Sequence, residues 1–412
     1  MSVGSSHDTG ILSGLRVVEV ASFIFGPVAA TIMTDFGAEV VKVEPPGIGD
    51  PYRILWRTPP MPVAEVDYCW TLDARNKRSI SIDLKKDAGR QIVLRLLEGA
   101  DVFVTNYQPS VLTQLRLRHE DIAPLHPRLI YAHATGYGLD GADVEQPGFD
   151  MTAYWARSGL MSAVAPADSE PALSVAGMGD HPSATALFGG IMLALYRRER
   201  TGRGSYVSTS LMANGAWANG CFLQAAMCGG KHFVRQSHAT ALNALVNHYV
   251  CQCGRRFILC CLAPARDWPA LCRAIEMPDL EHDPRFATGE QRQANSRALI
   301  AVLDERFGAH DWEHWRSVFA RHGIVWSRVP DAEEVIHDEQ MIANRVLVPI
   351  EGAAQPGLHT VSSPIEVRDV AKVRPRPAPS VGQHTREVLT ELGYPAATID
   401  ALVAEKVVQE QE

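Results

Sequence analysis

Short apolar runs and amphipathic stretches alternate along the N-terminal half of the chain. Residues 15–20 (LRVVEV) form a short β-branched run, and residues 25–36 have a helical pattern that ends at Gly37. A second β-branched run follows at residues 39–44 (EVVKVE), the order that a strand–helix–strand unit requires. Strands alternating with helices predict an α/β fold with a parallel, Rossmann-like sheet. The same pattern predicts a strand at 79–84, a helix at 87–97, and strands at 101–105 and 129–134.

A longer amphipathic helix is expected at residues 183–200, where apolar residues recur every three or four positions. It ends in the basic residues Arg197, Arg198 and Arg200, before a turn at 201–204. These cations either complement the helix dipole at a solvated end or contribute to contacts in a dimer. The residues alone leave both interpretations open.

The pattern changes after about residue 240. A hairpin is expected from residues 247–251 and 256–262, around Cys253 and Gly254. Asp331 and Glu334 have the spacing of a capping box at the start of one more helix. Together these features predict a smaller α+β domain. Its other expected elements are helices at 268–275, 294–307 and 312–322 and a strand at 324–329.

A chain of 412 residues exceeds what one hydrophobic core usually serves, so two domains are expected. We assign residues 1–225 to the large domain, 226–240 to a linker and 241–335 to the small domain. Residues 336–412 would form a second linker and a C-terminal segment that packs back on the large domain. The run at 374–379 (RPRPAP) is typical of an extended linker.

Charge and hydropathy limit the partners. The chain has 39 Lys and Arg against 47 Asp and Glu, a net charge of -8, which argues against nucleic acid as a bulk electrostatic partner. The longest helical apolar stretch, about residues 184–196, is too short to span a bilayer. Residues 1–10 lack the pattern of a signal peptide. We therefore expect a cytoplasmic protein with no membrane partner.

Four of the eight cysteines cluster at positions 251, 253, 260 and 261. A C-x-C followed by C-C could suggest a metal, but the C-x-x-C spacing of zinc sites is missing and the residues lie in strand-like runs. We expect buried reduced thiols and no metal site.

Asp180 stands out as a candidate catalytic residue. It lies in the run Gly-Met-Gly-Asp-His-Pro at 177–182, where two glycines precede the carboxylate and Pro182 marks the start of a helix. Asp180 could simply cap that helix. Alternatively, the glycines let a substrate approach while the helix N-terminus holds an anionic nucleophile.

Asp150 is a second candidate. It follows a Pro147-Gly148 turn and Phe149, and it precedes Tyr154. It could cap a helix or accept hydrogen bonds that order the site. Other catalytic patterns are missing: there is no G-x-S-x-G, H-E-x-x-H or P-loop motif, and no G-x-G-x-x-G follows the first strand. A dinucleotide site is therefore disfavoured.

Taken together, the chain resembles the class III coenzyme A transferases, the family of formyl-CoA:oxalate and carnitine CoA-transferases that also contains the α-methylacyl-CoA racemases. Any one motif is weak, but the ordered set is specific and covers nearly the whole chain. The matching runs are residues 15–20, 35–45 (DFGAEVVKVEP), 76–80 (NKRSI), 100–107 (ADVFVTNY), 136–138 (GYG), 179–180 (GD) and 201–204 (TGRG).

The resemblance implies that Asp180 is the nucleophile. In this family the aspartate attacks the donor thioester to give an aspartyl–acyl anhydride, and CoA then attacks the aspartyl carbonyl to give an enzyme–CoA thioester. The acceptor carboxylate and CoA repeat the exchange in reverse. Water must be excluded, because both intermediates can be hydrolysed. The resemblance also implies an interlocked homodimer, an acyl-CoA donor, a small carboxylate acceptor, and no permanently bound cofactor.

The resemblance also implies a binding site for CoA as a substrate. Two positions depart from the formyl-CoA transferase pattern, because Pro45 and Gln114 stand where that pattern has arginines. Phosphate contacts must then come partly from other cations, for which Arg75, Lys77 and Arg78 are candidates. The implied CoA-binding positions are the turn at residues 22–27, with Ser22 and Phe23, and Ile82, Lys85 and Asn106.

The racemase branch is the main alternative. Racemases pair the Gly-Asp aspartate with a histidine in a Gly-His-Asp run, where this chain has Phe149. Phenylalanine cannot transfer a proton, so the residues favour a transferase over an isomerase. A non-catalytic CoA-binding homologue is a third possibility. The sequence does not identify the two acids.

Overall fold

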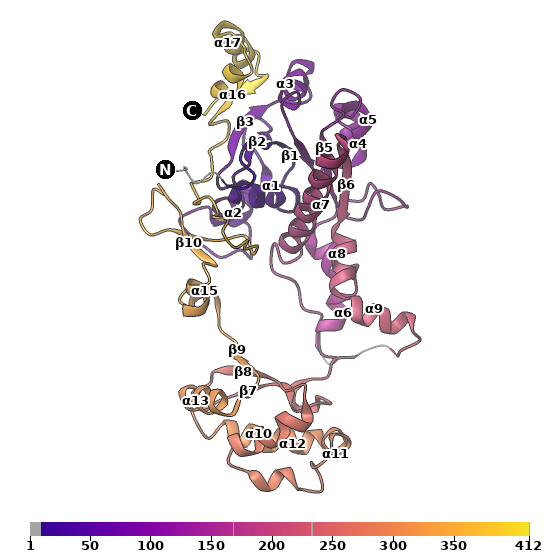
Figure 1. Ribbon diagram of the computed structural model, residues 1–412, viewed down its shortest axis with the longest axis vertical. Coiled ribbons are helices and arrows are strands. Elements are labelled where there is room, and N and C mark those ends of the chain that lie inside the picture. The colour runs from indigo at the N-terminus through magenta and orange to yellow at the C-terminus, as the bar shows by residue number, and fades with distance from the viewer. Residues whose placement is uncertain (1–9, 168, 232–233, 412) are drawn as a thin grey trace, which may run out of the picture. The chain divides into compact units, whose positions relative to one another are not determined.

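The computed structural model describes residues 10–167, 169–231 and 234–411. The chain forms two compact units, and Figure 1 shows their elements. The first comprises residues 1–161, 173–227 and 342–412, and the second comprises residues 162–172 and 228–341. Residues 162–172 belong to the second unit, although they lie inside the range that the sequence pattern assigns to the large domain. The boundaries drawn from the sequence stay a proposal.

A seven-stranded sheet forms the centre of the first unit, in the order β12-β3-β2-β1-β4-β5-β6. All neighbouring strands are parallel except β12 and β3, which are antiparallel. The expected parallel α/β sheet is therefore confirmed, and β6 and β12 extend it beyond the predicted strands. The strands are β1 (Arg16–Val20), β2 (Glu39–Glu44), β3 (Arg78–Ile82), β4 (Val102–Thr105), β5 (Ile130–Thr135), β6 (Ser205–Ser210) and β12 (Val408–Gln409).

Helices cover both faces of this sheet because successive residues of a strand point to opposite faces. Val17 packs into one core with Met33 and Leu187, while Val18 packs into another with Ile92 and Leu389. The first core contains α1 (Phe25–Asp35) and α7 (Asp180–Thr201), and the second contains α3 (Asp87–Leu97), α16 (Thr385–Glu391) and α17 (Ala396–Ala404). Other elements of this unit are η1 (Pro51–Arg57), α2 (Tyr68–Asp73), α4 (Pro109–Leu115), α5 (His119–Ile122), η2 (Asp150–Ala156), α8 (Leu211–Ala218), α9 (Gly220–Met227), β10 (Leu347–Pro349) and β11 (His359–Val361).

A buried ion network ties β1 and β2 to the loop after β2 and to the residue that precedes β3. The Nζ atom of Lys42 lies 2.6 Å from a carboxylate oxygen of Glu19 and 2.8 Å from one of Asp50. The second carboxylate oxygen of Glu19 lies 2.8 Å from Nζ of Lys77, which also donates to the Pro27 carbonyl. Burial opposes the charge of Lys42, but its carboxylate neighbours outweigh burial and raise its pKa, so Lys42 is a cation in the fold.

The second unit has a three-stranded antiparallel sheet and an aromatic core. Trp315, Phe307 and Phe257 pack together in this core with almost no exposure. The expected hairpin and helices are present. Asp331 caps α14 by accepting from the Glu334 N–H at 2.9 Å, but the Glu334 carboxylate forms an ion pair with Arg255. The elements are β7 (Val246–Val250), β8 (Arg256–Cys260), β9 (Trp326–Arg328), α10 (Pro264–Ala274), α11 (Gly289–Ala294), α12 (Ser296–Phe307), α13 (Trp312–His322) and α14 (Ala332–Val335), with α6 (Leu160–Val164) and α15 (Glu339–Ala343) at the unit boundaries.

The start of α7 depends on close packing at a glycine. The helix begins at Asp180, and Gly179 is its N-cap residue. A Cβ atom on Gly179 would lie only 2.5 Å from Cγ of Tyr154, in the π-helical turn η2. Glycine is therefore required here by space, because its backbone φ of -93° is accessible to any residue.

Replacing Gly179 with alanine should destabilise the fold by about 1–3 kcal/mol, because the added methyl group must displace the Tyr154 ring. Gly189 is the matched control, since it lies within the same helix and a Cβ there meets no atom within 4 Å. Gly189→Ala should raise helix stability by up to about 1 kcal/mol. Thermal unfolding of both variants measures this contrast, and equal melting temperatures would contradict the packing.

Replacing Lys42 with methionine should destabilise the fold by about 3–5 kcal/mol, because Glu19 and Asp50 then lose the cation that they share inside the protein. Arg316→Met is the control, since its ion pair with Glu313 is exposed on the surface of α13 and contributes little. Urea unfolding near neutral pH compares the two variants. A similar small loss in both would show that the buried network contributes no more than a surface pair.

Candidate active site

The sheet has its topological switch point between β1 and β4, because β2 lies beyond β1 on one side and β5 beyond β4 on the other. In parallel sheets of this kind, ligands bind at the carboxyl ends of the strands at such a point. Ser22 follows β1, and Asn106 follows β4. Their contacts are reciprocal: the Ser22 N–H donates to Oδ1 of Asn106 at 2.9 Å, and Nδ2 of Asn106 donates to the Ser22 carbonyl at 2.7 Å.

Three segments that the sequence singled out meet at this edge. The Phe23 ring, in the turn after β1, lies edge-on to the Phe149 ring with their centroids 5.4 Å apart. A Cβ on Gly177 would lie 3.7 Å from Cδ1 of Ile24, so the loop before α7 contacts the same turn. Because α7 leads into the parallel strand β6, its N-terminus lies at the carboxyl ends of the strands. The candidate CoA turn, the Asp150 turn and the Asp180 loop are thus neighbours.

Asp180 is buried, with 9% of its surface exposed, and it is the first residue of α7. The N-cap position belongs to Gly179, so the alternative in which Asp180 caps this helix is wrong. No hydrogen bond to the Asp180 carboxylate comes from the residues that the structure describes. Burial first, and then the charge of Asp150, raise the pKa of Asp180 to about 8, while His181 acts in the opposite direction.

Asp150 orders the backbone beside Asp180. One of its carboxylate oxygens accepts from the Gly179 N–H at 3.3 Å, and the other accepts from the Met151 N–H at 2.7 Å. It is the first residue of η2, a π-helical turn of the kind often found at functional sites. The geometry therefore favours the interpretation in which Asp150 accepts hydrogen bonds that organise the site.

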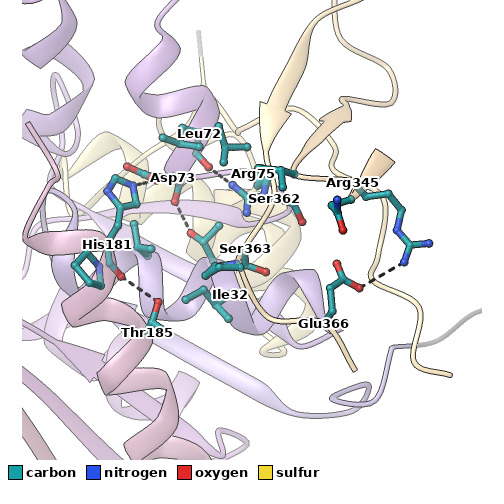
Figure 2. Close-up of a pocket in the computed structure, with 17 residues that line it drawn as sticks. Ile32, Leu72, Asp73, Arg75, His181, Thr185, Arg345, Ser362, Ser363 and Glu366 are labelled. Atoms are coloured by element: carbon teal, nitrogen blue, oxygen red, sulfur yellow. Dashed lines mark hydrogen bonds and ion pairs between the residues drawn. The ribbon is translucent and has the colours of Figure 1, made fainter. Parts of the chain in front are cut away.

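His181 forms a contact that the sequence did not reveal. Its Nε2 atom lies 3.1 Å from Oδ1 of Asp73, and its Nδ1 atom lies 2.9 Å from the Gly177 carbonyl oxygen. Figure 2 shows the two side chains pointing toward one another from α7 and α2. Burial opposes a charged imidazole, but Asp73 outweighs this effect and raises the pKa of His181 to about 9. Asp73 and His181 are far apart in the sequence, so no local motif could pair them.

His181 and Asp73 also line a cavity of roughly 780 Å³ in the first unit. Figure 2 shows Ile32 and Leu72 on its wall, together with Arg345 and Glu366 from the C-terminal segment. Arg345 and Glu366 form a long ion pair of 3.8 Å with each other. The walls are mainly apolar, and neither the cavity nor its lining was expected from the sequence.

The three cations suggested for phosphate binding already have partners. Arg75 is buried and forms two hydrogen bonds with the Asp35 carboxylate, at 3.0 and 2.7 Å. Lys77 is buried against Glu19, and Arg78 pairs with two glutamates of α16, Glu387 and Glu391. Arg75 and Lys77 therefore serve as structural cations, because pairing and burial remove both from solvent.

The remaining CoA candidates differ in exposure. Ile82 is buried at the carboxyl end of β3, where it pairs with Val408 of β12. Lys85 is exposed, with its backbone N–H donating to the Asp83 carboxylate at 3.0 Å.

Within residues 10–167, 169–231 and 234–411, no cluster of three or more His, Cys, Asp or Glu side chains could hold a metal ion. No helix in those ranges is long and apolar enough to cross a membrane.

Known CoA-transferases are similar to this chain over nearly its whole length. The chain is 32% identical to an acetyl-CoA:oxalate CoA-transferase of Acetobacter aceti, over 94% of this chain and 97% of that protein. It is 31% identical to an (R)-2-hydroxy-4-methylpentanoate CoA-transferase of Clostridioides difficile, over 97% of this chain and 100% of that protein. A crystal structure of a CAIB/BAIF family protein from Brucella suis matches 93% of this chain and 100% of its own, with a TM-score of 0.82 and 27% identity.

The model of CoA-transferase family III matches residues 12–385, which is most of the chain. The resemblance drawn from the sequence motifs is thereby confirmed. The chain belongs to CoA-transferase family III.

Proposed function

We propose that this protein is an acyl-CoA:carboxylate CoA-transferase in which Asp180 carries the acyl group and then CoA. The observation that supports this most directly is the state of the Asp180 carboxylate. It is buried, it lies at the N-terminus of α7, and it accepts no hydrogen bond from the described residues. A desolvated carboxylate without hydrogen bonds retains its lone pairs for attack on a carbonyl carbon.

The reaction is balanced at each step. The Asp180 carboxylate attacks the donor thioester, the C–S bond breaks, and an aspartyl–acyl anhydride and a CoA thiolate result. The thiolate attacks the aspartyl carbonyl and releases the donor acid, which leaves an aspartyl-CoA thioester. The acceptor carboxylate displaces the thiolate to form a new anhydride, and the thiolate attacks its acyl carbonyl. The products are the acceptor's CoA thioester and free Asp180. No metal or redox group takes part.

The surrounding residues support this chemistry. Asp150 fixes the Gly179 N–H and so positions the backbone that carries Asp180. The turn at 22–27, which leads into α1, and Asn106 are the proposed CoA site, at the switch point of the sheet. Exposed Lys85 is the better candidate for a phosphate contact, since Arg75 and Lys77 are buried in ion pairs.

A racemase is the less favoured function. Phe149 occupies the position of the racemase histidine. The residue is 54% exposed, and its ring packs edge-on against Phe23. His181 does not replace that histidine, because both of its ring nitrogens already contact acceptors. Neither Phe149 nor His181 therefore supplies the second base of a two-base proton exchange.

We also propose that the protein is a cytoplasmic homodimer with the interlocked arrangement of its family. Exposed apolar side chains on α7 and α8 support a partner surface in the first unit, since Leu193 is 73%, Tyr196 63% and Trp217 87% exposed. Such side chains, when gathered, are typical of protein interfaces.

The relatives suggest which acids to test. They are named for 2-hydroxy-4-methylpentanoate, glutarate and oxalate, which span 2-hydroxy acids and dicarboxylates. A mixture of such carboxylates, offered with several acyl-CoAs, covers the proposed substrate class. Mass spectrometry of the CoA products identifies the accepted pair.

The proposed mechanism predicts a covalent intermediate on Asp180. Incubation with an accepted acyl-CoA, followed by hydroxylamine, should convert Asp180 to its hydroxamate, which peptide mass spectrometry locates. Asp180→Asn should lose this label and slow transfer by at least about 10³-fold, since the covalent route is removed.

Lys85→Ala is the comparison variant, and it should retain the label while weakening CoA binding. Transfer at the wild-type rate in Asp180→Asn would refute the mechanism. Exchange of the substrate α-proton with deuterium, without CoA transfer, would instead favour a racemase.

A further inference from the structure

The His181 ring lies between two hydrogen-bond acceptors. Its Nε2 atom is 3.1 Å from the Asp73 carboxylate, and its Nδ1 atom is 2.9 Å from the Gly177 carbonyl oxygen. Neither partner can donate a hydrogen bond. A neutral imidazole has one N–H and can satisfy only one acceptor, whereas the imidazolium has two. The contacts therefore select the charged form of His181.

Asp73 is held in place to receive this charge. It is 2% exposed, and its second carboxylate oxygen accepts from the Tyr52 hydroxyl at 2.5 Å. Burial and then Asp73 raise the pKa of Tyr52, so this tyrosine stays protonated and acts as a donor. The backbone carbonyl of Asp73 also accepts from the Thr31 hydroxyl in α1. Tyr52, Asp73 and His181 thus form a fixed chain that ends one residue from Asp180.

We propose that His181 is a positioning residue whose fixed positive charge favours the ionised form of Asp180, the form that attacks the thioester, and that Asp73 maintains this charge. This inference rests on the proposed function of Asp180. It assigns opposite effects to the two neighbours, since Asp150 disfavours the Asp180 anion and His181 favours it.

The titratable groups next to this cluster come from α2, η1 and η2. Asp73 of α2 contacts His181, Tyr52 of η1 contacts Asp73, and the charge of Asp150 of η2 acts on Asp180. Tyr154 of η2 packs against Gly179. In the adjoining cavity, Arg75 is paired with Asp35, and Arg345 is paired with Glu366.

The first test measures how the rate of acyl-enzyme formation in a single turnover depends on pH. The release of CoA is the signal. In the wild type the rate should rise as the pH increases through about 8, because ionisation of Asp180 creates the nucleophile. His181→Gln should move this midpoint up by about one pH unit, since an opposite charge nearby lowers a carboxyl pKa by one to three units. At neutral pH this shift lowers the rate roughly tenfold.

Three variants give the comparison. Asp73→Asn should move the midpoint in the same direction as His181→Gln but less far, because His181 loses its anionic partner while the smaller direct repulsion between Asp73 and Asp180 is also removed. Asp150→Asn should move it down, because a negative charge near Asp180 is removed. Thr185→Val is the matched control on the same helix, because the Thr185 hydroxyl donates to the His181 backbone carbonyl, at 3.1 Å, and the change adds or removes no charge. Its pH profile should match the wild type.

A second measurement needs no activity. Both the wild type and His181→Gln are labelled with ¹⁵N at the histidine rings and compared by NMR. The wild-type resonance that is missing from the variant belongs to His181. It should show an imidazolium that persists to about pH 9. Titration at the ordinary histidine pKa would overturn the inference, as would an unshifted midpoint in His181→Gln. If no hydroxamate forms on Asp180 in the wild type, the proposed function is refuted instead, whatever the charge of the His181 ring.

Discussion

The buried network of Lys42, Glu19, Asp50 and Lys77 is the constraint on which the active-site edge depends. Charges inside a protein are tolerated only with partners, and here each charge belongs to a different strand or loop. Lys42 joins β1, β2 and the loop after β2, while Lys77 reaches the Pro27 carbonyl of α1. The turn at 22–27 is therefore set by charges beneath it. Asp50 also accepts from the Phe23 N–H, which holds that residue at a positive φ of 62°.

A second constraint on the site is the control of the Asp180 carboxylate by its neighbours. Asp180 is removed from water, close to an anion on one side and a cation on the other. Asp150 serves the backbone and His181 serves the charge, so geometry and ionisation are set by different residues. This separation explains why two acidic side chains can lie at one site: Asp150 has backbone N–H donors, and the carboxylate of Asp180 accepts none from the described residues.

Local patterns predicted much of this structure. Strands β1 to β5, α3 at Asp87–Leu97 and α13 at Trp312–His322 could be read from apolar spacing, because each pattern is complete within its own segment. The Gly-Asp motif located Asp180 for the same reason.

Contacts between distant segments could not be read in this way. Asp73 and His181 are 108 residues apart, and β12 is a two-residue strand whose existence depends on the edge of β3. The burial of Lys77 against Glu19 could not be read from the sequence either, because the partner carboxylate lies in strand β1. Burial beneath a sheet is a property of the whole fold.

The placement of the C-terminal residues has a consequence for biosynthesis. Val388, Leu389 and Ile399 cover one face of the central sheet, and β12 pairs with its edge strand β3. A ribosome delivers these residues after the whole of the second unit. Until then the nascent sheet exposes an apolar face and an unpaired edge, both of which favour aggregation. Folding of the first unit therefore has to wait until residues 388–409 have been made, and a chain truncated before them would be left with a vulnerable sheet.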